Sequence, residues 1–356
     1  MKNLTIIGGG SWGTALAIVL APRFPQVKLW VYEADLAARM RQSRENDVYL
    51  PGFVLAGRVE VSSDLGEALS DAEIVLSVVP SHLVRHLYEQ MKPHVRESML
   101  LVSATKGLEN GTLLRMSEVV REVLGGGGWG AGPGSVPGAE GRDSGLGAGG
   151  RGRWRVAVLS GPSFAREVAR GEPTAIVSAS EDPSVAAQVQ AAFSGPSFRV
   201  YTSGDPTGVE IGGSIKNVVA IGAGVLHGLG LGHNAMAALI TRGLAEMTRL
   251  AVAMGGKPPT MAGLAGLGDL VLTCNGDLSR NRTVGIELAH GRTLEEITGS
   301  MKMVAEGVKT TNAAVDLAKR YSVEMPIAEQ MYQMLHSGAS PREAIQRLME
   351  RSLKGE

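Results

Sequence analysis

The first chemically informative residues are three glycines near the N-terminus. Gly8, Gly10 and Gly13 follow the apolar run 4–7 and open a helix-like segment, 14–20. At this spacing the first glycine allows a tight bend, the second lets the backbone approach a pyrophosphate, and the third lets helix and strand pack closely. The free N–H groups and the positive dipole end of the helix favour phosphate. The pattern therefore predicts a dinucleotide-binding turn.

An acidic residue stands where such a site binds the adenosine ribose. The segment 27–32 is predicted as a second strand, and Glu33 at its end lies twenty residues after the third glycine. A carboxylate here accepts hydrogen bonds from the ribose hydroxyls and repels a 2′-phosphate, which favours NAD over NADP. Two alternatives stay open. Lys28, Arg39 or Arg41 could supply positive charge for NADP, and Glu33 could be an ordinary solvated strand end.

Two lysines could take part in proton chemistry. Lys106 leaves the carboxyl end of the expected strand 98–104, on the sheet edge where ligands bind, although a lone lysine there could also be a solvated surface charge. Lys216 is the one cation in a small or apolar helical run, 211–225, so it either extends to solvent or is held in a cleft. Desolvation and a neighbouring cation such as Lys106 would lower its pKa and let it exchange a proton near neutral pH.

Two later segments carry further polar side chains. Asp269 follows a glycine-rich turn, where its carboxylate could face a ligand or cap the next helix. Ser279, Arg280 and Asn281 lead into a helical segment, and a hydroxyl, a guanidinium, an amide and free helix N–H groups together suit a phosphate monoester. An ordinary charged loop is the alternative. Cys274 and the seven histidines show no metal-ligand spacing.

These residues need a sheet and a set of helices to position them. Apolar strands alternate with helical segments in the first half of the chain, which indicates a parallel, doubly wound α/β sheet of the Rossmann type. We expect strands at 4–7, 27–32, 72–80, 98–104, 155–160, 174–178 and 198–201, a helix at 35–44, and a helix capped by Ser81. The spacing predicts later helices at 208–226, 234–254, 283–290, 310–321, 326–335 and 341–351, the last capped by Ser340.

The pattern predicts two domains. Residues 1–203 form a dinucleotide-binding domain, and residues 204–356 form an all-helical substrate domain. Half of the residues in the segment 125–152 are glycine, and apolar periodicity is almost absent there. Such a segment cannot bury enough surface to offset its ordering entropy, so we interpret it as a flexible surface insertion in the first domain. A domain boundary is the alternative.

The composition of the 356 residues argues against several kinds of partner. Lys plus Arg and Asp plus Glu both number 35, so no net charge attracts nucleic acid or an anionic membrane. We see no secretory signal before the first strand, and no uninterrupted apolar stretch approaches the ~20 residues that span a bilayer. The single cysteine excludes an internal disulfide and a cysteine-based zinc site. We expect a cytoplasmic protein without a metal.

Several of these segments, taken in order, carry a family resemblance. The motifs are Gly8-Gly9-Gly10-Ser11-Trp12-Gly13-Thr14-Ala15-Leu16-Ala17, Val79-Pro80-Ser81-His82, Ala104-Thr105-Lys106-Gly107-Leu108-Glu109, Ser160-Gly161-Pro162-Ser163-Phe164-Ala165, Lys216-Asn217-Val218-Val219-Ala220-Ile221, Gly266-Leu267-Gly268-Asp269-Leu270, Ser279-Arg280-Asn281-Arg282 and Val304-Ala305-Glu306-Gly307. Together they resemble bacterial-type NAD(P)-dependent glycerol-3-phosphate dehydrogenase. The resemblance covers nearly the whole chain apart from the glycine-rich segment.

The resemblance implies a cytoplasmic homodimer that interconverts dihydroxyacetone phosphate and sn-glycerol 3-phosphate with NAD or NADP and supplies phospholipid synthesis. It also implies a helical domain like that of 6-phosphogluconate dehydrogenase. By this analogy Lys216 is the general acid/base, Lys106 contacts substrate and cofactor, and Asp269 holds the lysine or a substrate hydroxyl. The implied substrate positions are Lys106, Gly161, Ser163, Lys216, Asp269, Ser279, Arg280 and Asn281. The cofactor positions are the three glycines, Ser11, Trp12, Tyr32, Glu33, Lys106, Ala165, Arg280, Val304 and Glu306.

Three alternatives bear on this expectation. Tyr32 departs from many relatives, which have Arg or His there, so NADP use stays open. Another two-domain dehydrogenase, of the 3-hydroxyacid or 6-phosphogluconate type, would also combine a Rossmann domain with helices. A non-catalytic dinucleotide sensor would bind cofactor without turnover, and the polar loops around Lys106, Lys216 and Arg280 argue against it.

Overall fold

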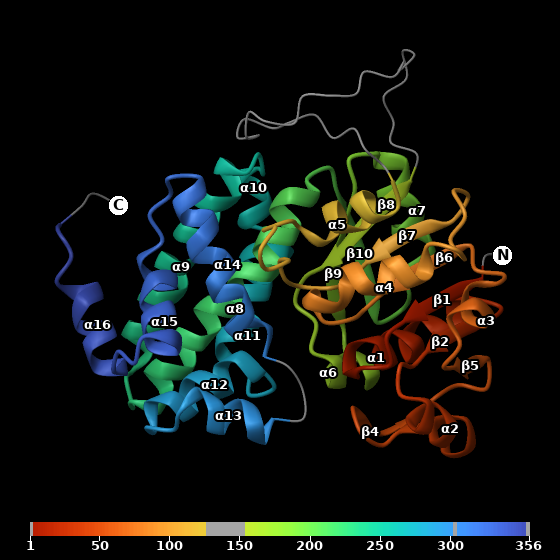
Figure 1. The fold of residues 1–356 in the computed structure, drawn as a ribbon, viewed down its shortest axis with the longest axis horizontal. Helices are drawn as coiled ribbons and strands as arrows, with labels where there is room; N and C mark the ends of the chain where they lie inside the picture. The colour runs from red at the N-terminus through yellow and green to blue at the C-terminus, as the bar shows by residue number, and fades with distance from the viewer. Residues whose placement is uncertain (1–2, 126–153, 302–304, 354–356) are drawn as a thin grey trace, which may run out of the picture.

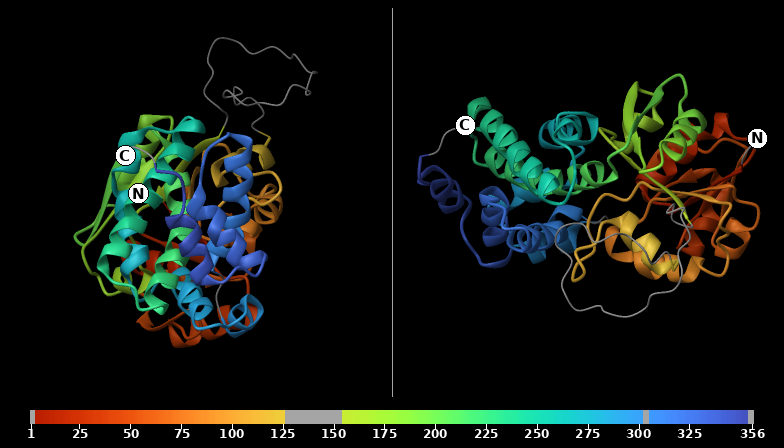
Figure 2. Two further views of the ribbon diagram at one scale, coloured as in Figure 1. Left: turned by 90° about the vertical axis from the view of Figure 1, so that its left-hand side faces the viewer. Right: turned by 90° about the horizontal axis from the view of Figure 1, so that it is seen from above.

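A sheet-containing part and a helical part make up the structure. The computed structural model describes residues 3–125, 154–301 and 305–353. The two parts lie side by side, with the chain ends on opposite sides of the molecule (Figure 1). They again lie next to each other when the molecule is seen from above (Figure 2). The expected α/β sheet followed by helices is confirmed.

The strands of the first part form one eight-stranded sheet in the order β10-β9-β8-β7-β6-β1-β2-β5. Their bounds are β1 (Leu4–Ile7), β2 (Val27–Trp30), β5 (Val59–Ser62), β6 (Ile74–Ser77), β7 (Leu100–Ser103), β8 (Arg155–Ser160), β9 (Thr174–Ala179) and β10 (Phe198–Ser203). All seven expected strands are present. β5 and a small antiparallel pair, β3 (Glu45–Asn46) with β4 (Leu50–Val54), were not predicted from the sequence.

The prediction of a parallel sheet is wrong at one pair of neighbours. β8 and β9 pair antiparallel, whereas the other pairs in the sheet are parallel. A parallel crossover needs a helix that spans the sheet. The connection from β8 to β9 holds only the five-residue helix α6 (Ala165–Ala169), which packs against the first helix, α1 (Ser11–Leu20), so the chain turns back instead.

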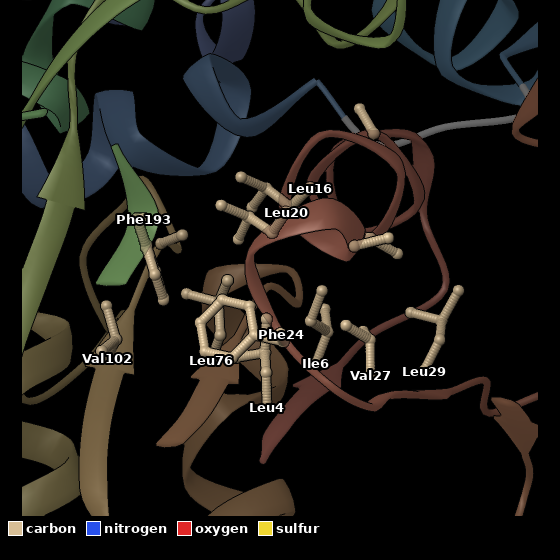
Figure 3. Packing of buried hydrophobic residues seen from close by; sticks show 14 of the residues in the cluster. Leu4, Ile6, Leu16, Leu20, Phe24, Val27, Leu29, Leu76, Val102 and Phe193 are labelled. Atoms are coloured by element: carbon tan, nitrogen blue, oxygen red, sulfur yellow. The ribbon is translucent and has the colours of Figure 1, made fainter. Parts of the chain in front are cut away.

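Burial of the strands on both faces explains their apolar sequences. All four residues of β1 are buried, and Leu4 and Ile6 share a core cluster with Leu16 and Leu20 of α1 (Figure 3). The remaining helices of this part are α2 (Ala34–Ser43), α3 (Leu65–Leu69), α4 (Val84–Met91), α5 (Met116–Val123) and α7 (Pro183–Phe193), with short 3₁₀ turns η1 (Ala21–Arg23) and η2 (Ser81–Leu83). The interpretation of 125–152 as an insertion concerns residues that, apart from Gly125, lie outside the described ranges.

The second part is built around one long helix, α8 (Pro206–Gly228), which also contacts β8 and β9 of the sheet. The other helices are α9 (His233–Ala253), α10 (Pro258–Met261), the π-helical turn η3 (Leu264–Gly268), α11 (Asp269–Asn275), α12 (Arg280–Ala289), α13 (Leu294–Ser300), α14 (Glu306–Arg320), α15 (Pro326–His336) and α16 (Pro341–Met349). The six expected helices are present, with α12 beginning three residues and α14 four residues earlier than predicted; α10, η3, α11 and α13 were missed. Ser340 caps α16 as expected, its hydroxyl accepting from the N–H of Glu343.

One helix, α8, is long and apolar enough to be a candidate membrane span, which the sequence did not lead us to expect. By length and composition this helix is apolar enough to cross a membrane, although no uninterrupted apolar stretch of that length stands in the sequence. Its most apolar 18-residue window is entirely buried inside the protein. The helix is therefore the core of the second part, which the other helices surround.

An ion pair ties the two parts together near the start of α8. Glu210 of α8 is buried and accepts hydrogen bonds from the Arg115 guanidinium and from the Ser117 backbone and hydroxyl, at 2.7, 2.8 and 2.7 Å. Arg115 and Ser117 lie at the N-terminus of α5, where a carboxylate also satisfies free helix N–H groups. This contact fixes α8 against the sheet-containing part.

The crossing of α8 and α12 depends on glycine. A Cβ added to Gly285 of α12 would overlap the Ile221 carbonyl oxygen of α8, and one added to Gly224 would overlap the Arg282 carbonyl oxygen. The two backbones are thus closer than any side chain allows. This close approach sets where the first turn of α12 lies relative to Lys216.

We predict that Gly285→Ala lowers the free energy of unfolding by about 1–3 kcal/mol, because the helices must separate to admit a methyl group. Urea unfolding monitored by circular dichroism measures the change. Gly299→Ala is the matched control, since a Cβ at that position of α13 meets open space. Equal stability of the two variants would contradict the close crossing.

Candidate functional site

The glycine turn has the geometry of a phosphate cradle. Gly8 has φ +125°, a conformation that side chains rarely adopt, and a Cβ on Gly13 would overlap the Gly8 carbonyl oxygen. A Cβ on Gly10 would meet nothing within 4 Å, so the backbone there is open to a ligand. Gly10 is the N-cap of α1, with no side chain on the helix N–H groups. The turn therefore fits the pyrophosphate of a dinucleotide.

Three charged groups from both parts of the protein meet at the carboxyl edge of the sheet. Asp269 is 1% exposed and accepts a hydrogen bond from each of two lysines. Its Oδ1 lies 2.8 Å from Lys216 Nζ, and its Oδ2 lies 2.9 Å from Lys106 Nζ. Lys106 follows β7, whereas Lys216 and Asp269 belong to α8 and α11. We call these residues the Lys106–Asp269–Lys216 cluster; Asp269 contacts both lysines in it, and its role toward a substrate stays a prediction.

Burial and charge together set the protonation of Lys216. The residue is 5% exposed, and desolvation lowers the pKa of its amine to about 8. The Asp269 carboxylate raises this pKa and the nearby Lys106 ammonium lowers it, each by less than the effect of burial. The expectation of a lowered pKa is confirmed, and the amine can exchange a proton near neutral pH.

Thr273 is a member of the site that sequence analysis missed. Its Oγ1 donates to the Asp269 carbonyl oxygen at 2.6 Å and lies 2.7 Å from Lys216 Nζ, which donates to it. Thr273 stands one helical turn after Asp269 on α11, so both side chains lie on the same face of the helix. That spacing was visible in the sequence, but it is informative only once Lys216 is known to face α11.

The π-helical turn η3 aims Asp269 at the lysines. Gly212 of α8 lets the turn approach, because a Cβ there would press on the Ala265 carbonyl group. Gly266 allows the turn to fold back on Met261 in the same way. Such π-helical turns often occur at functional sites. The alternative that Asp269 caps a helix is wrong, since Gly268 is the N-cap of α11 and makes no side-chain bond.

Lys106 is held by a second loop at the same edge of the sheet. Its Nζ donates to the Gly161 carbonyl oxygen at 2.9 Å and lies 3.4 Å from Ser163 Oγ. Ser163 Oγ itself donates to the Gly161 carbonyl oxygen at 2.9 Å. Gly161 has φ +137°, so glycine is favoured at this bend after β8. Lys106, Gly161 and Ser163 thus lie together at this edge of the sheet.

Ser81 does not act as the helix cap that the sequence predicted. Pro80 is the N-cap of the 3₁₀ turn η2, with no side-chain bond. The Ser81 hydroxyl donates instead to Glu306 Oε2 at 2.7 Å, and its backbone N–H donates to Oε1 at 3.3 Å. Glu306 begins α14, so this contact is a second link between the two parts. Burial raises the pKa of Glu306, and the bonds from Ser81 oppose the shift.

The predicted phosphate loop lies at the N-terminus of α12. Ser279 is the N-cap, and its hydroxyl accepts from the Arg282 backbone N–H at 3.3 Å. Asn281 bridges helices: it donates to Asn217 Oδ1 at 2.9 Å and accepts from the Gly307 N–H at 2.9 Å. Asn217 is next to Lys216, so this bridge places the loop beside the cluster. Asn281 is therefore occupied by the protein itself.

Arg280 differs from its neighbours. Among the described residues no side chain or backbone group hydrogen-bonds or ion-pairs with its guanidinium, and the residue is exposed. The next arginine, Arg282, is buried and paired with Asp277 at 2.9 Å. One arginine is thus free to bind an anion while the other is structural.

The remaining predicted cofactor residues surround the glycine turn or follow β2. Trp12 is half-buried in α1, and its Nε1 finds no partner in the described part of the chain. Ala165 begins α6, which packs against α1. Tyr32 is 77% exposed and packs edge-on against Trp30, and Glu33 is exposed at the N-cap of α2. Val304 lies outside the described residues.

No metal site accompanies these groups within residues 3–125, 154–301 and 305–353, since no cluster of three or more His, Cys, Asp or Glu side chains is present there. Cys274 is buried, and burial raises the pKa of its thiol to about 12.

A glycine turn of this kind at the carboxyl edge of the sheet, with a buried amine from a second helical part at the same edge, is the arrangement of dinucleotide-dependent dehydrogenases. The chain belongs to the NAD-dependent glycerol-3-phosphate dehydrogenase family. The family model for the N-terminus matches residues 3–133 and 149–186, and the model for the C-terminus matches residues 205–346. Residues 134–148, within the predicted insertion, have no counterpart in the N-terminal model.

Relatives along the whole length agree with this assignment. The chain is 53% identical over 353 residues to a protein of Koribacter versatilis, covering 99% of this chain and 98% of that protein. It is 52% identical to a protein of Syntrophotalea carbinolica, covering 99% of each. Both are named as glycerol-3-phosphate dehydrogenases of the NAD(P)+ type. The crystal structure of glycerol-3-phosphate dehydrogenase from Coxiella burnetii superposes with a TM-score of 0.87 at 39% identity, covering 98% of this chain and 99% of that one.

Proposed function

We propose that this chain interconverts dihydroxyacetone phosphate and sn-glycerol 3-phosphate with NAD(H) or NADP(H). The observation that carries the proposal is the Lys106–Asp269–Lys216 cluster, which presents a buried amine of lowered pKa at the sheet edge. Family membership supports the choice of substrate over the 3-hydroxyacids and 6-phosphogluconate. A non-catalytic sensor would have no need for such an amine.

The glycine turn and its neighbours suit the coenzyme. Gly8, Gly10 and Gly13 would hold the pyrophosphate, and Glu33 would accept hydrogen bonds from the adenosine ribose. Trp12 offers a buried N–H without a partner among the described residues, and Ala165 lies beside α1. When bound, the reduced nicotinamide supplies the hydride for carbonyl reduction.

Lys216 supplies the proton in this proposal. Reduction at C2 of the ketone puts negative charge on the carbonyl oxygen, and the Lys216 ammonium stabilises that charge and transfers its proton to the oxygen. The neutral amine left behind recovers a proton from solvent before the next turnover. Asp269 and Thr273 hold the Nζ atom in place, and Lys106 orients the carbonyl group together with the Gly161 and Ser163 loop.

Arg280 and the N-terminus of α12 suit the substrate phosphate. The exposed guanidinium lies at the first residue of α12, where the helix dipole also favours an anion. Binding energy from the phosphate is remote from the reacting carbon and helps to orient it. Ser279 and Asn281 support this loop through the helix cap and the bridge to Asn217.

The organisation and setting of the enzyme follow from the same proposal. We place the domain division between β10 and α8, at residues 203 and 204; the C-terminal family model, which begins at residue 205, supports it. We expect a cytoplasmic homodimer that supplies glycerol 3-phosphate for phospholipid synthesis and binds no nucleic acid or membrane. A balanced charge of 35 basic and 35 acidic residues supports the last point.

The direct test follows oxidation of NADH and of NADPH separately, by absorbance, with dihydroxyacetone phosphate as substrate. We expect turnover with at least one of the two coenzymes. A 3-hydroxyacid precursor and unphosphorylated dihydroxyacetone serve as comparison substrates. Turnover confined to another ketone would contradict the proposal.

We predict that Lys216→Ala lowers kcat ~100-fold or more, the usual contribution of a positioned general acid, while NADH still binds. Steady-state rates and a fluorescence titration of NADH measure the two effects. Lys319→Ala, at an exposed position of α14, is the control. Near-normal turnover of Lys216→Ala would rule out its role.

We predict that Arg280→Ala raises the KM for dihydroxyacetone phosphate at least ~10-fold, because a charge-assisted bond to phosphate is lost. Thermal unfolding should change little, since Arg280 makes no hydrogen bond or ion pair with another described residue and interacts only through its charge with Glu306. Arg320→Ala, at the exposed end of α14, is the matched control. If the rate with unphosphorylated dihydroxyacetone falls equally, Arg280 does not bind the phosphate.

We predict that kcat for ketone reduction falls as pH rises through about 8, because Lys216 loses the proton that it must donate. The Asp269 carboxylate raises the Lys216 pKa, so Asp269→Asn should move this fall to lower pH. Rates measured across the pH range test both statements, with the exposed Asp316→Asn as control. A fall that moves to higher pH in Asp269→Asn would contradict the assigned charge effect.

A further inference from the structure

Tyr49 connects the two halves of the proposed coenzyme site. Its phenolic hydroxyl donates to Glu33 Oε1 at 2.7 Å, and its backbone oxygen accepts from Ser11 Oγ at 2.6 Å. Ser11 is the first residue of α1, within the glycine turn, whereas Glu33 stands at the end of β2. One half-buried residue therefore spans the phosphate cradle and the ribose carboxylate.

The backbone of Tyr49 is itself fixed to the turn. Its N–H donates to Asn46 Oδ1 at 2.9 Å. The Asn46 amide is fully buried and donates to the Gly9 carbonyl oxygen at 2.7 Å and to Thr14 Oγ1 at 2.8 Å. Asn46 and Tyr49 belong to the β3–β4 region, which the sequence analysis did not anticipate. This region is therefore hydrogen-bonded to the glycine turn, although it is not part of the eight-stranded sheet.

The hydroxyl of Tyr49 orients the Glu33 carboxylate. With Oε1 accepting from the phenol, Oε2 has no hydrogen-bond partner among the described residues and can accept from a ribose hydroxyl. The hydrogen bond and charge of Glu33 raise the pKa of Tyr49, so its hydroxyl stays a donor. An anionic acceptor held this way suits a 2′-hydroxyl and repels a 2′-phosphate.

Each of the three cations that could have favoured NADP is already engaged. Lys28 Nζ lies 2.6 Å from Asp71 Oδ1. Arg39 makes two bonds to the Asp47 carboxylate, at 3.1 and 3.2 Å. Arg41 donates to the Val61 carbonyl oxygen at 3.3 Å. Lys28 and Arg39 are paired with carboxylates and Arg41 with a carbonyl oxygen. None of the three forms an ion pair with Glu33.

We propose that Tyr49 is a positioning residue that sets coenzyme selectivity: it holds Glu33 so that the chain selects NAD over NADP. The inference rests on the proposed dehydrogenase function only for its kinetic readout. Tyr49 acts through Glu33 and needs no contact with the coenzyme. Because Tyr49 belongs to the β3–β4 region, the preference for NAD over NADP depends on that region as well as on Glu33 at the end of β2.

The test is Tyr49→Phe, which deletes the hydroxyl and keeps the ring. We expect the Kd for NADH, from fluorescence titration, to rise about threefold to tenfold, the range of one ordinary hydrogen bond. The Kd for NADPH stays the same or falls, so the ratio of the two constants narrows. The KM for dihydroxyacetone phosphate, measured at saturating NADH, stays unchanged. Tyr201→Phe, which deletes the hydroxyl of an exposed tyrosine on β10, is the control.

Glu33→Ala supplies the background that separates positioning from simple packing. In that background Tyr49→Phe should leave the NADH-to-NADPH ratio unchanged, because its target is gone. An equal loss of both coenzymes in Tyr49→Phe, or a persistent effect without Glu33, would overturn the proposal. The titrations need no turnover. If dihydroxyacetone phosphate is not reduced but the titrations behave as expected, the proposed reaction fails and the role of Tyr49 stands.

Discussion

The site depends on a single buried carboxylate shared by two lysines. Burying Asp269, Lys106 and Lys216 separately would be costly, because each charge would lose its hydration. Together the two Asp269 oxygens satisfy one ammonium each, which leaves one net positive charge at the carboxyl edge of the sheet. That surplus suits an oxygen on which negative charge develops. It also requires the two parts of the protein to stay together, since Lys106 comes from one and Asp269 and Lys216 from the other.

The rest of the architecture serves to hold these three groups in register. α8 is buried over most of its length, so Lys216 is only 5% exposed and desolvation lowers its pKa. Glu210 fixes α8 to α5, and Ser81 fixes α14 to the loop after β6. Glycine at the α8–α12 crossing sets the position of Arg280 and Asn281. Polar links therefore fix the joint between the parts, while close backbone packing fixes the helices around the lysines.

Much of this was predictable from local sequence, and the failures have physical reasons. Leu4–Ile7 and the glycine turn identified the first strand and helix because both signals are local. The antiparallel β8–β9 pair was not predictable, since apolar strands look alike whichever way they run and only the packing of α6 against α1 turns the chain back. Ser81 looked like a cap, but its partner, Glu306, lies 225 positions away. Asn46 and Thr273 were missed because their roles depend on long-range contacts.

One crystal structure would test the central claim most directly: the complex with NAD+ and dihydroxyacetone phosphate, a pair that cannot react because both members are oxidised. The account predicts that Lys216 Nζ lies within hydrogen-bond distance of the ketone oxygen, with Asp269 still between the two lysines and the phosphate on Arg280. A ketone oxygen bound away from Lys216, or a phosphate on other residues, would contradict it.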